Sequence, residues 1–235
     1  MSLLSSIKKR STLDAAIKQV AQARKADGGR AEQLFKGAYQ GFASVVSDQP
    51  LVADGLYHWG FALLHEAKTK QGQEAVEIYE DAISKFSFCL LIATNYLGAA
   101  IDGGVAFMEL ARISPDESKP GLYQLAESFF EKACDIQTGS AAYNLACIFA
   151  LRGDQETCLA ALRTARDYGS LPDEPNILQD EDMADVIDQA WFKDFLEEVR
   201  AKVAEPKEKL KDVQIDVEPN FKLKKTEDFD YYSKS

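Results

Sequence analysis

Two histidines and four cysteines are the residues of this chain that could bind a metal ion or act as nucleophiles. His58 and His65 are seven residues apart, which would place them two turns apart on one face of a helix. Metal-binding pairs on helices usually lie three or four residues apart, with a carboxylate nearby. The cysteines show no metal-ligand spacing, and they are Cys89, Cys134, Cys147 and Cys158. We therefore predict no metal, no cofactor, and cysteines that are small buried side chains in a reducing compartment.

Sequence motifs of enzymes are missing. The chain has no phosphate loop, no glycine-rich dinucleotide turn, and neither a GxSxG nor an HExxH motif. No serine or cysteine is spaced from the two histidines in a way that suggests a catalytic triad. The sequence predicts a protein without catalytic residues.

Charge is distributed unevenly along the chain. The formal net charge of −11 argues against binding to nucleic acids. Residues 1–30 hold seven Lys or Arg and two Asp, a net charge of +5, whereas residues 173–198 hold ten Asp or Glu and one Lys, a net charge of −9. One interpretation is a solvated surface. The other is electrostatic steering of a basic partner toward the C-terminal end.

Apolar residues recur at helical spacing almost everywhere, and the alternating pattern of strands is nearly absent. This pattern predicts an all-α fold. The expected helices lie at about 13–20, 34–45, 56–67, 75–86, 99–113, 122–136, 141–151, 156–168, 180–189 and 191–203.

A triplet of small, large and small residues repeats along the chain. Its three copies are Ala38, Phe42 and Val45, then Ala82, Phe86 and Cys89, then Ala126, Phe130 and Ala133. The period is 44 residues in both intervals (82 − 38 and 126 − 82), and a further small residue precedes each triplet by 22 residues. These preceding residues are Ala16, Gly60 and Gly104. A fixed period of this length indicates stacked helical units, which build a long binding surface rather than one catalytic pocket.

These residues resemble the tetratricopeptide repeat family. The best match is the segment 142–149, followed by Gly153-Asp154 and then by Cys158, Leu162 and Ala165. The resemblance covers roughly residues 12–170 and implies a right-handed α-solenoid of about four stacked helical hairpins. Long connections such as 67–75 resemble, more loosely, those of the plant-type mitochondrial import receptor of this family.

In that family the first helix of each hairpin lines the concave face. The resemblance therefore places one set of side chains in a partner-binding groove: Tyr57, His58, Phe61, His65, Asp102, Val105, Met108, Glu109, Tyr143, Asn144 and Cys147. These positions include no Lys or Arg, so we predict no binding to the acidic C-termini of cytosolic heat-shock chaperones. For Asn144 two roles remain open, contact with a bound peptide or a tolerated polar residue in a helix.

The expected organisation has four parts. Residues 1–11 form a basic N-terminal segment, 12–170 the repeats, 171–204 the capping helices and 205–235 a flexible charged tail. Trp191 and Phe192 are expected to seal the last hairpin. The aromatic cluster at 229–232 could anchor the tail on this protein or on a partner, and docking on its own groove would lower partner affinity.

The main functional prediction is a non-catalytic adaptor, scaffold or assembly factor, chaperone-like in kind, that binds a protein or peptide and belongs to a larger complex. One alternative is a peripheral membrane receptor or targeting factor, since Leu3, Leu4 and Ile7 precede the basic residues 8–10. Another alternative is an accessory subunit of an enzyme. We predict a cytoplasmic location, or another reducing intracellular compartment, and we expect contact with nucleic acids or membranes to be absent or unlikely.

Overall fold

The structure, a computed structural model, describes residues 3–47 and 51–204, and the side chains within 7–47 and 51–201. This part of the chain is helical and contains no strand. The helices are α1 (Leu3–Ala23), α2 (Gly28–Val46), α3 (Val52–Ala67), α4 (Gly72–Ile92), α5 (Leu97–Ile113), α6 (Lys119–Ile136), α7 (Ala142–Leu151), α8 (Gln155–Tyr168), α9 (Glu174–Leu178), the 3₁₀ turn η1 (Glu181–Met183) and α10 (Ala190–Ala204).

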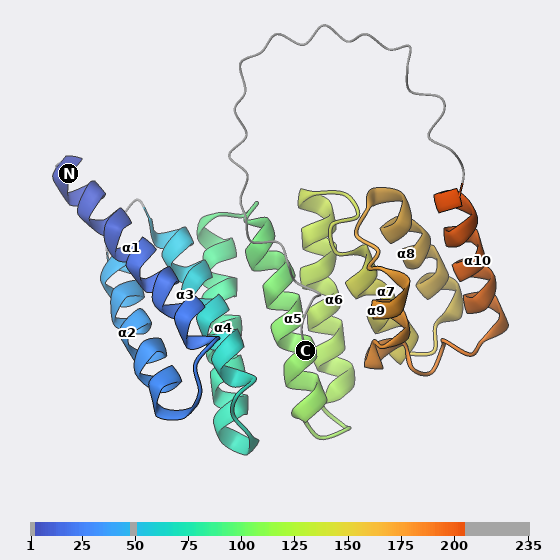
Figure 1. The fold of residues 1–235 in the computed structure, drawn as a ribbon, viewed down its shortest axis with the longest axis horizontal. Helices are drawn as coiled ribbons and strands as arrows, with labels where there is room; N and C mark the ends of the chain where they lie inside the picture. Colours follow the sequence, from blue (N-terminus) through green and yellow to red (C-terminus); the bar gives the residue numbers. More distant parts are fainter. Residues whose placement is uncertain (1–2, 48–50, 205–235) are drawn as a thin grey trace, which may run out of the picture.

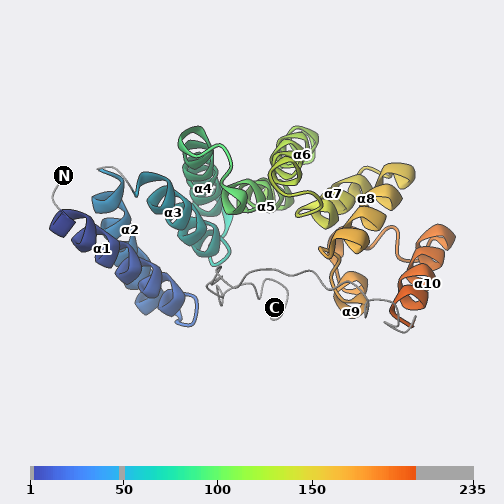
Figure 2. The ribbon, with the colours of Figure 1, turned by 90° about the horizontal axis from the view of Figure 1, so that it is seen from above.

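The first eight helices pack as four consecutive hairpins, α1/α2, α3/α4, α5/α6 and α7/α8, in one row (Figure 1). Seen from above, the row is curved, with α4, α6 and α8 on the outer side and α3, α5 and α7 lining the inner side (Figure 2). At the two ends α1 and α9 turn toward the hollow of the curve. The prediction of an all-α solenoid of stacked hairpins is confirmed.

The repeated triplets form the core between paired helices. Phe42, Phe86 and Phe130 are each fully buried. The small residue 22 positions earlier faces the aromatic ring: a Cβ added to Gly60 would lie 2.9 Å from Phe86, and one added to Gly104 would lie 2.5 Å from Phe130. Since contacts this short exclude a side chain, the glycines let the two helices of a hairpin approach closely.

This close approach gives a test of the packing. Replacing Gly104 by alanine is expected to lower the free energy of unfolding by about 1–3 kcal/mol, because the new methyl group would press on the Phe130 ring. Urea denaturation followed by circular dichroism measures the effect. Gly121→Ala in α6 is the matched control, since a Cβ there meets nothing within 4 Å, and it should leave stability unchanged or raised. Equal stability of the two variants would contradict the close packing.

One predicted element is wrong. The helix expected at 180–189 is replaced by η1 followed by turns, and the short helix α9 precedes it. The Asp180 side chain accepts a hydrogen bond from the backbone N–H of Asp182 at 3.0 Å, which stabilises a turn in place of a helix. Burial of Met183 and Val186 then keeps this irregular segment on the core.

The predicted division of the chain stays a prediction in its details. From Leu3 onward the basic N-terminal segment is part of α1 rather than a separate element. Phe192 is buried against the last hairpin and Trp191 packs partly against the same core. The expected tail at 205–235, with its aromatic cluster, lies outside the described residues.

Candidate functional site

The N-terminal half of the concave face carries a row of aromatic side chains from α3. Tyr57, Phe61 and His65 are four residues apart, so they share one face of that helix. The ring centroids of Tyr57 and Phe61 are 6.3 Å apart, and those of Phe61 and His65 are 4.4 Å apart. The guanidinium group of Arg24, which follows α1, lies 5.5 Å from the Phe61 ring centroid, within the range of a cation–π contact. We call Tyr57, Phe61, His65 and Arg24 the aromatic row.

His65 is held in its neutral form by this environment. Its Nε2 atom is buried and has no hydrogen-bond partner among the described residues. Burial lowers the pKa of His65 to about 3, and the nearby charges of Arg24 and Lys68 act in the same direction, opposed by Glu109. Burial also lowers the pKa of His58. Within the described part of the chain, neither histidine joins a group of three metal-ligating side chains.

At the start of α3 the aromatic row is tied to α5. The Tyr57 hydroxyl donates a hydrogen bond to Asp102 at 3.1 Å, and the hydroxyl of Tyr96 donates one to Asp54 at 3.2 Å. Burial, assisted by the Asp102 carboxylate, raises the pKa of Tyr57. Asp102 is only 4% exposed, so its role in the structure is to hold Tyr57 and not to face solvent.

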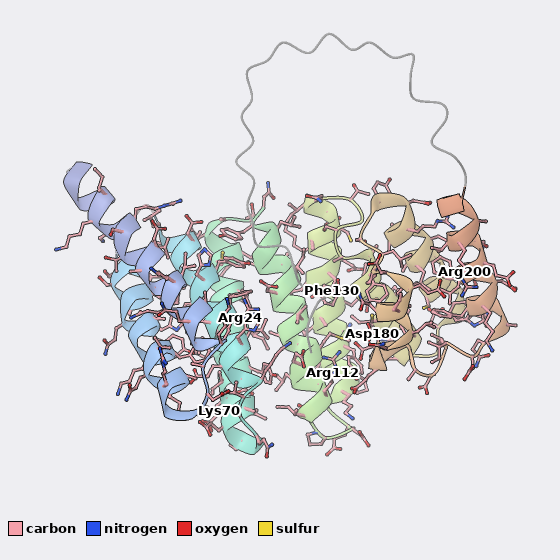
Figure 3. The ribbon with its side chains drawn as sticks, viewed as in Figure 1. Arg24, Lys70, Arg112, Phe130, Asp180 and Arg200 are labelled. Atoms are coloured by element: carbon pink, nitrogen blue, oxygen red, sulfur yellow. The ribbon has the colours of Figure 1, made fainter. Side chains whose placement is uncertain are left out.

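A chain of alternating charges crosses the concave face from α3 to η1. Lys68 pairs with Glu109 at 2.9 Å, Glu109 with Arg112 at 3.0 Å, and Arg112 with Asp182 at 2.5 Å. Figure 3 shows Arg112 and Asp180 on neighbouring parts of this face. Burial alone would raise the pKa of Glu109, but its two cationic partners outweigh burial and lower it. The chain of ion pairs marks the end of the aromatic row.

The C-terminal half of the concave face is covered by the chain itself. The Tyr143 hydroxyl donates a hydrogen bond to Asp180 at 2.8 Å, and the Cys147 sulfur lies 3.9 Å from the same carboxylate oxygen. Ile177 and Met183 are fully buried in the same core. We call residues 177–187 the closing segment, because it lies over α7 and ends the accessible groove there.

Beneath the closing segment a thiol meets two carboxylates. Cys147, Asp180 and Asp182 each offer a ligand atom, and these atoms lie within 4.8 Å of one another. Burial raises the pKa of the Cys147 thiol, and burial also raises the pKa of Asp182 although Arg112 opposes the change. The carboxylates are already engaged by Tyr143 and Arg112, so the group acts as an internal contact between α5, α7 and η1.

The structure separates the predicted groove residues into two sets. Those that keep partial exposure on the concave helices are Tyr57, His58, Phe61, His65, Val105, Glu109 and Asn144. Those that are buried within the chain are Asp102, Met108, Tyr143 and Cys147. Contact of the first set with a partner stays a prediction, and the second set could reach a partner only after local rearrangement.

Sequence reasoning missed the cations of this face. The predicted groove positions include no Lys or Arg, but Arg24, Lys68 and Arg112 contact or pair with residues at those positions. Lys68 follows His65 by three residues and Arg112 follows Met108 by four. Both residues lie one helical turn beyond a predicted groove position, on the same face of their helix, so extending the predicted groove by one turn would have found them. Arg24 lies just after the end of α1, and the repeat pattern assigns no groove position to the connection between two helices.

A curved stack of helical hairpins, with an aromatic and polar concave face and no set of catalytic groups among the described residues, defines a helical-repeat binding protein. The family model described as "Plant specific mitochondrial import receptor subunit TOM20" matches residues 26–155, from just before α2 to the start of α8. The chain belongs to this family. The predicted tetratricopeptide-like fold is therefore confirmed as a helical-hairpin fold, within this more specific family.

Two relatives from Arabidopsis thaliana support the assignment. The chain is 32% identical over 111 residues to mitochondrial import receptor subunit TOM20-3, an alignment that covers 47% of this chain and 55% of the relative. It is 32% identical over 96 residues to subunit TOM20-1, which covers 40% of this chain and 51% of the relative. The matched regions thus span about half the length of these relatives. No solved structure shows a significant match.

The comparisons correct the predicted location. A family of mitochondrial import receptor subunits is not one of free cytoplasmic proteins, so the cytoplasmic prediction is wrong, and nothing supports the term chaperone-like. Import receptors are not enzymes, in agreement with the prediction of a non-catalytic protein. None of the helices described in the structure combines the length and apolar character needed to cross a membrane.

Proposed function

We propose that this protein is a receptor subunit of mitochondrial protein import and that its aromatic row holds a segment of an incoming precursor protein. The observation that carries the proposal is the family match over residues 26–155, which includes α3 and α5 and therefore most of the accessible concave face. The proposed function corresponds to the alternative prediction from the sequence, a targeting factor, and not to the main prediction of a general adaptor or assembly factor.

The geometry of the concave face supports this role. Phe61 and His65 offer partly exposed aromatic surface, while the cation Arg24 and the ion pair of Lys68 with Glu109 lie at its edges. Apolar and aromatic contacts supply most of the affinity in peptide grooves, and polar groups at the rim set the register. Since the closing segment covers Tyr143, the bound segment would lie across α1, α3 and α5 and end near Glu109 and Asn144.

A receptor of this kind acts at the mitochondrial surface that precursors reach first. The earlier expectation that membrane contact is unlikely therefore has no support. Ile7 is 59% exposed at the N-terminal part of α1, beside Lys8 and Arg10, which are also exposed. We propose that protein partners at that surface, including other subunits of an import complex, hold the receptor in place.

The test is binding of a fluorescently labelled mitochondrial precursor segment to the full chain, measured by anisotropy. Phe61→Ala is expected to weaken binding at least tenfold, because it removes the centre of the aromatic row. His58→Ala and Asn144→Ala should have smaller effects. Circular dichroism of each variant verifies that the fold is retained.

Phe88→Ala is the matched control. It removes the same ring from α4, on the outer layer of the stack, where Phe88 is 57% exposed. Its affinity for the precursor segment should equal that of the unchanged protein. A Phe61→Ala variant that binds normally, or a Phe88→Ala variant that binds poorly, would place the precursor on another surface and contradict the proposal.

A further inference from the structure

Arg24 is a cation of the concave face that has no anionic partner among the residues that the structure describes. Lys68 and Arg112 are neutralised by Glu109 and Asp182, and Arg10 lies 3.7 Å from Asp54. Arg24 forms no ion pair with any residue in the ranges 3–47 and 51–204, and its guanidinium group instead lies over the Phe61 ring at 5.5 Å. The aromatic row therefore combines a guanidinium group that has no ion pair among the described residues with partly exposed aromatic surface.

This combination suits a ligand that is both acidic and aromatic. A carboxylate can form a charge-assisted, bidentate hydrogen bond with Arg24 while the guanidinium group keeps its contact with the ring below. An aromatic side chain next to that carboxylate can pack against the partly exposed rings of Phe61 and His65.

The chain contains one segment with this chemistry. Residues 227–232 read Glu-Asp-Phe-Asp-Tyr-Tyr, three carboxylates and three aromatic rings in six positions. They are joined to the last described residue, Ala204, by 22 residues (205–226). Fully extended, such a connection spans about 70 Å. The hollow of the curve lies between α3 and α10 (Figure 2), so a connection from α10 can reach α3 without passing around the stack.

We propose that residues 227–232 bind intramolecularly to the aromatic row, with a carboxylate on Arg24 and an aromatic ring against Phe61. A tethered ligand acts at an effective concentration in the millimolar range, so even a weak contact would occupy the site for much of the time. An external ligand would then have to displace the segment. The apparent affinity of that ligand would be lower in proportion to the fraction of the protein in which residues 227–232 occupy the aromatic row.

The experiment measures this contact without any precursor, so its failure is distinguishable from failure of the proposed function. A labelled peptide of residues 225–235 is titrated into the full chain and into the full-length variant F229S/Y231S/Y232S, with anisotropy as the readout. The peptide should bind the variant at least tenfold more tightly than the unchanged chain, in which the attached segment competes. Affinity should fall as salt is raised, because the contact includes an exposed ion pair.

Site variants placed in the F229S/Y231S/Y232S background locate the contact. Arg24→Glu should weaken peptide binding at least tenfold and Arg24→Gln less, while Phe88→Ser on the outer layer should leave it unchanged. In a second readout, hydrogen exchange of α3 amides should be slower in the unchanged chain than in the tail variant. Equal peptide affinity for both chains, or sensitivity to Phe88→Ser without sensitivity to Arg24→Glu, would overturn the proposal.

Discussion

Replacing Phe130 by alanine is expected to lower the free energy of unfolding by about 3–5 kcal/mol. The Phe130 ring is fully buried, and it fills the space above Gly104 between the two helices of the third hairpin. Its loss removes a large apolar surface from the core and leaves a cavity, since glycine has no side chain that could fill it. Urea denaturation at neutral pH measures the change.

Phe88→Ala serves again as the control, because it deletes the same group from an exposed position. It should change the free energy of unfolding by less than about 1 kcal/mol, so the two alanine variants should differ by several kilocalories per mole. If Phe130→Ala lowered the free energy of unfolding as little as Phe88→Ala, the buried aromatic residues of the triplets would not be what holds the hairpins together.

Acidification is expected to destabilise the protein through His65. Its pKa is about 3 in the folded state and about 6.5 in an unfolded chain. The unfolded state therefore binds a proton below pH 6.5 that the folded state does not, and stability falls as pH decreases from 6.5 toward 3. The free energy of unfolding is expected to be about 2 kcal/mol lower at pH 5 than at pH 8 because of His65. The variant His65→Gln should abolish this part of the dependence of stability on pH.

Other charged groups near His65 limit the pH range in which the effect of His65 on the free energy of unfolding can be measured. Arg24 and Lys68 lower the pKa of His65 and Glu109 opposes them. The Glu109 carboxylate, whose own pKa is lowered, adds acid sensitivity, so measurements belong above pH 5. The raised pKa of Asp182 has the opposite effect on stability, since protonation of this carboxyl as the pH falls favours the folded state.

The protein has only two histidines, so their ring resonances can be assigned with one variant each. His65 should show no titration down to the pH at which the protein unfolds. His58→Gln keeps His65 and should retain most of the slope, although burial lowers the pKa of His58 too. A His65 resonance that titrates near pH 6.5 would contradict the buried environment.

The core of the array was predictable from sequence because its packing repeats. The offset of 22 residues between Gly104 and Ala126 places a small residue of one helix opposite the triplet of the next, and the structure shows that contact as Gly104 on Phe130. The order and positions of the first eight helices followed from the same periodicity, but α1, α2 and α4 extend several residues beyond the expected ranges 13–20, 34–45 and 75–86.

The candidate site was predictable only in part. The positions on α3 and α5 follow from helical spacing, and Phe61, His65 and Glu109 keep partial exposure on these two helices, which line the inner side of the curve. The burial of Tyr143 did not follow, because it depends on a non-repeating segment that reaches back over α7. Arg24 was missed for a related reason: its position on Phe61 depends on how one hairpin is set against the next, which local pattern does not encode.

The closing segment has a mechanical consequence. Through Asp182 and Asp180 it connects α5 to α7, so those two helices cannot separate without breaking a charged contact or a part-buried hydrogen bond. The C-terminal half of the array is therefore braced by the same kinds of contact that tie α3 to α5, where Tyr57 donates to Asp102 and Lys68 pairs with Glu109, so a change of curvature between α3 and α7 would break charged contacts.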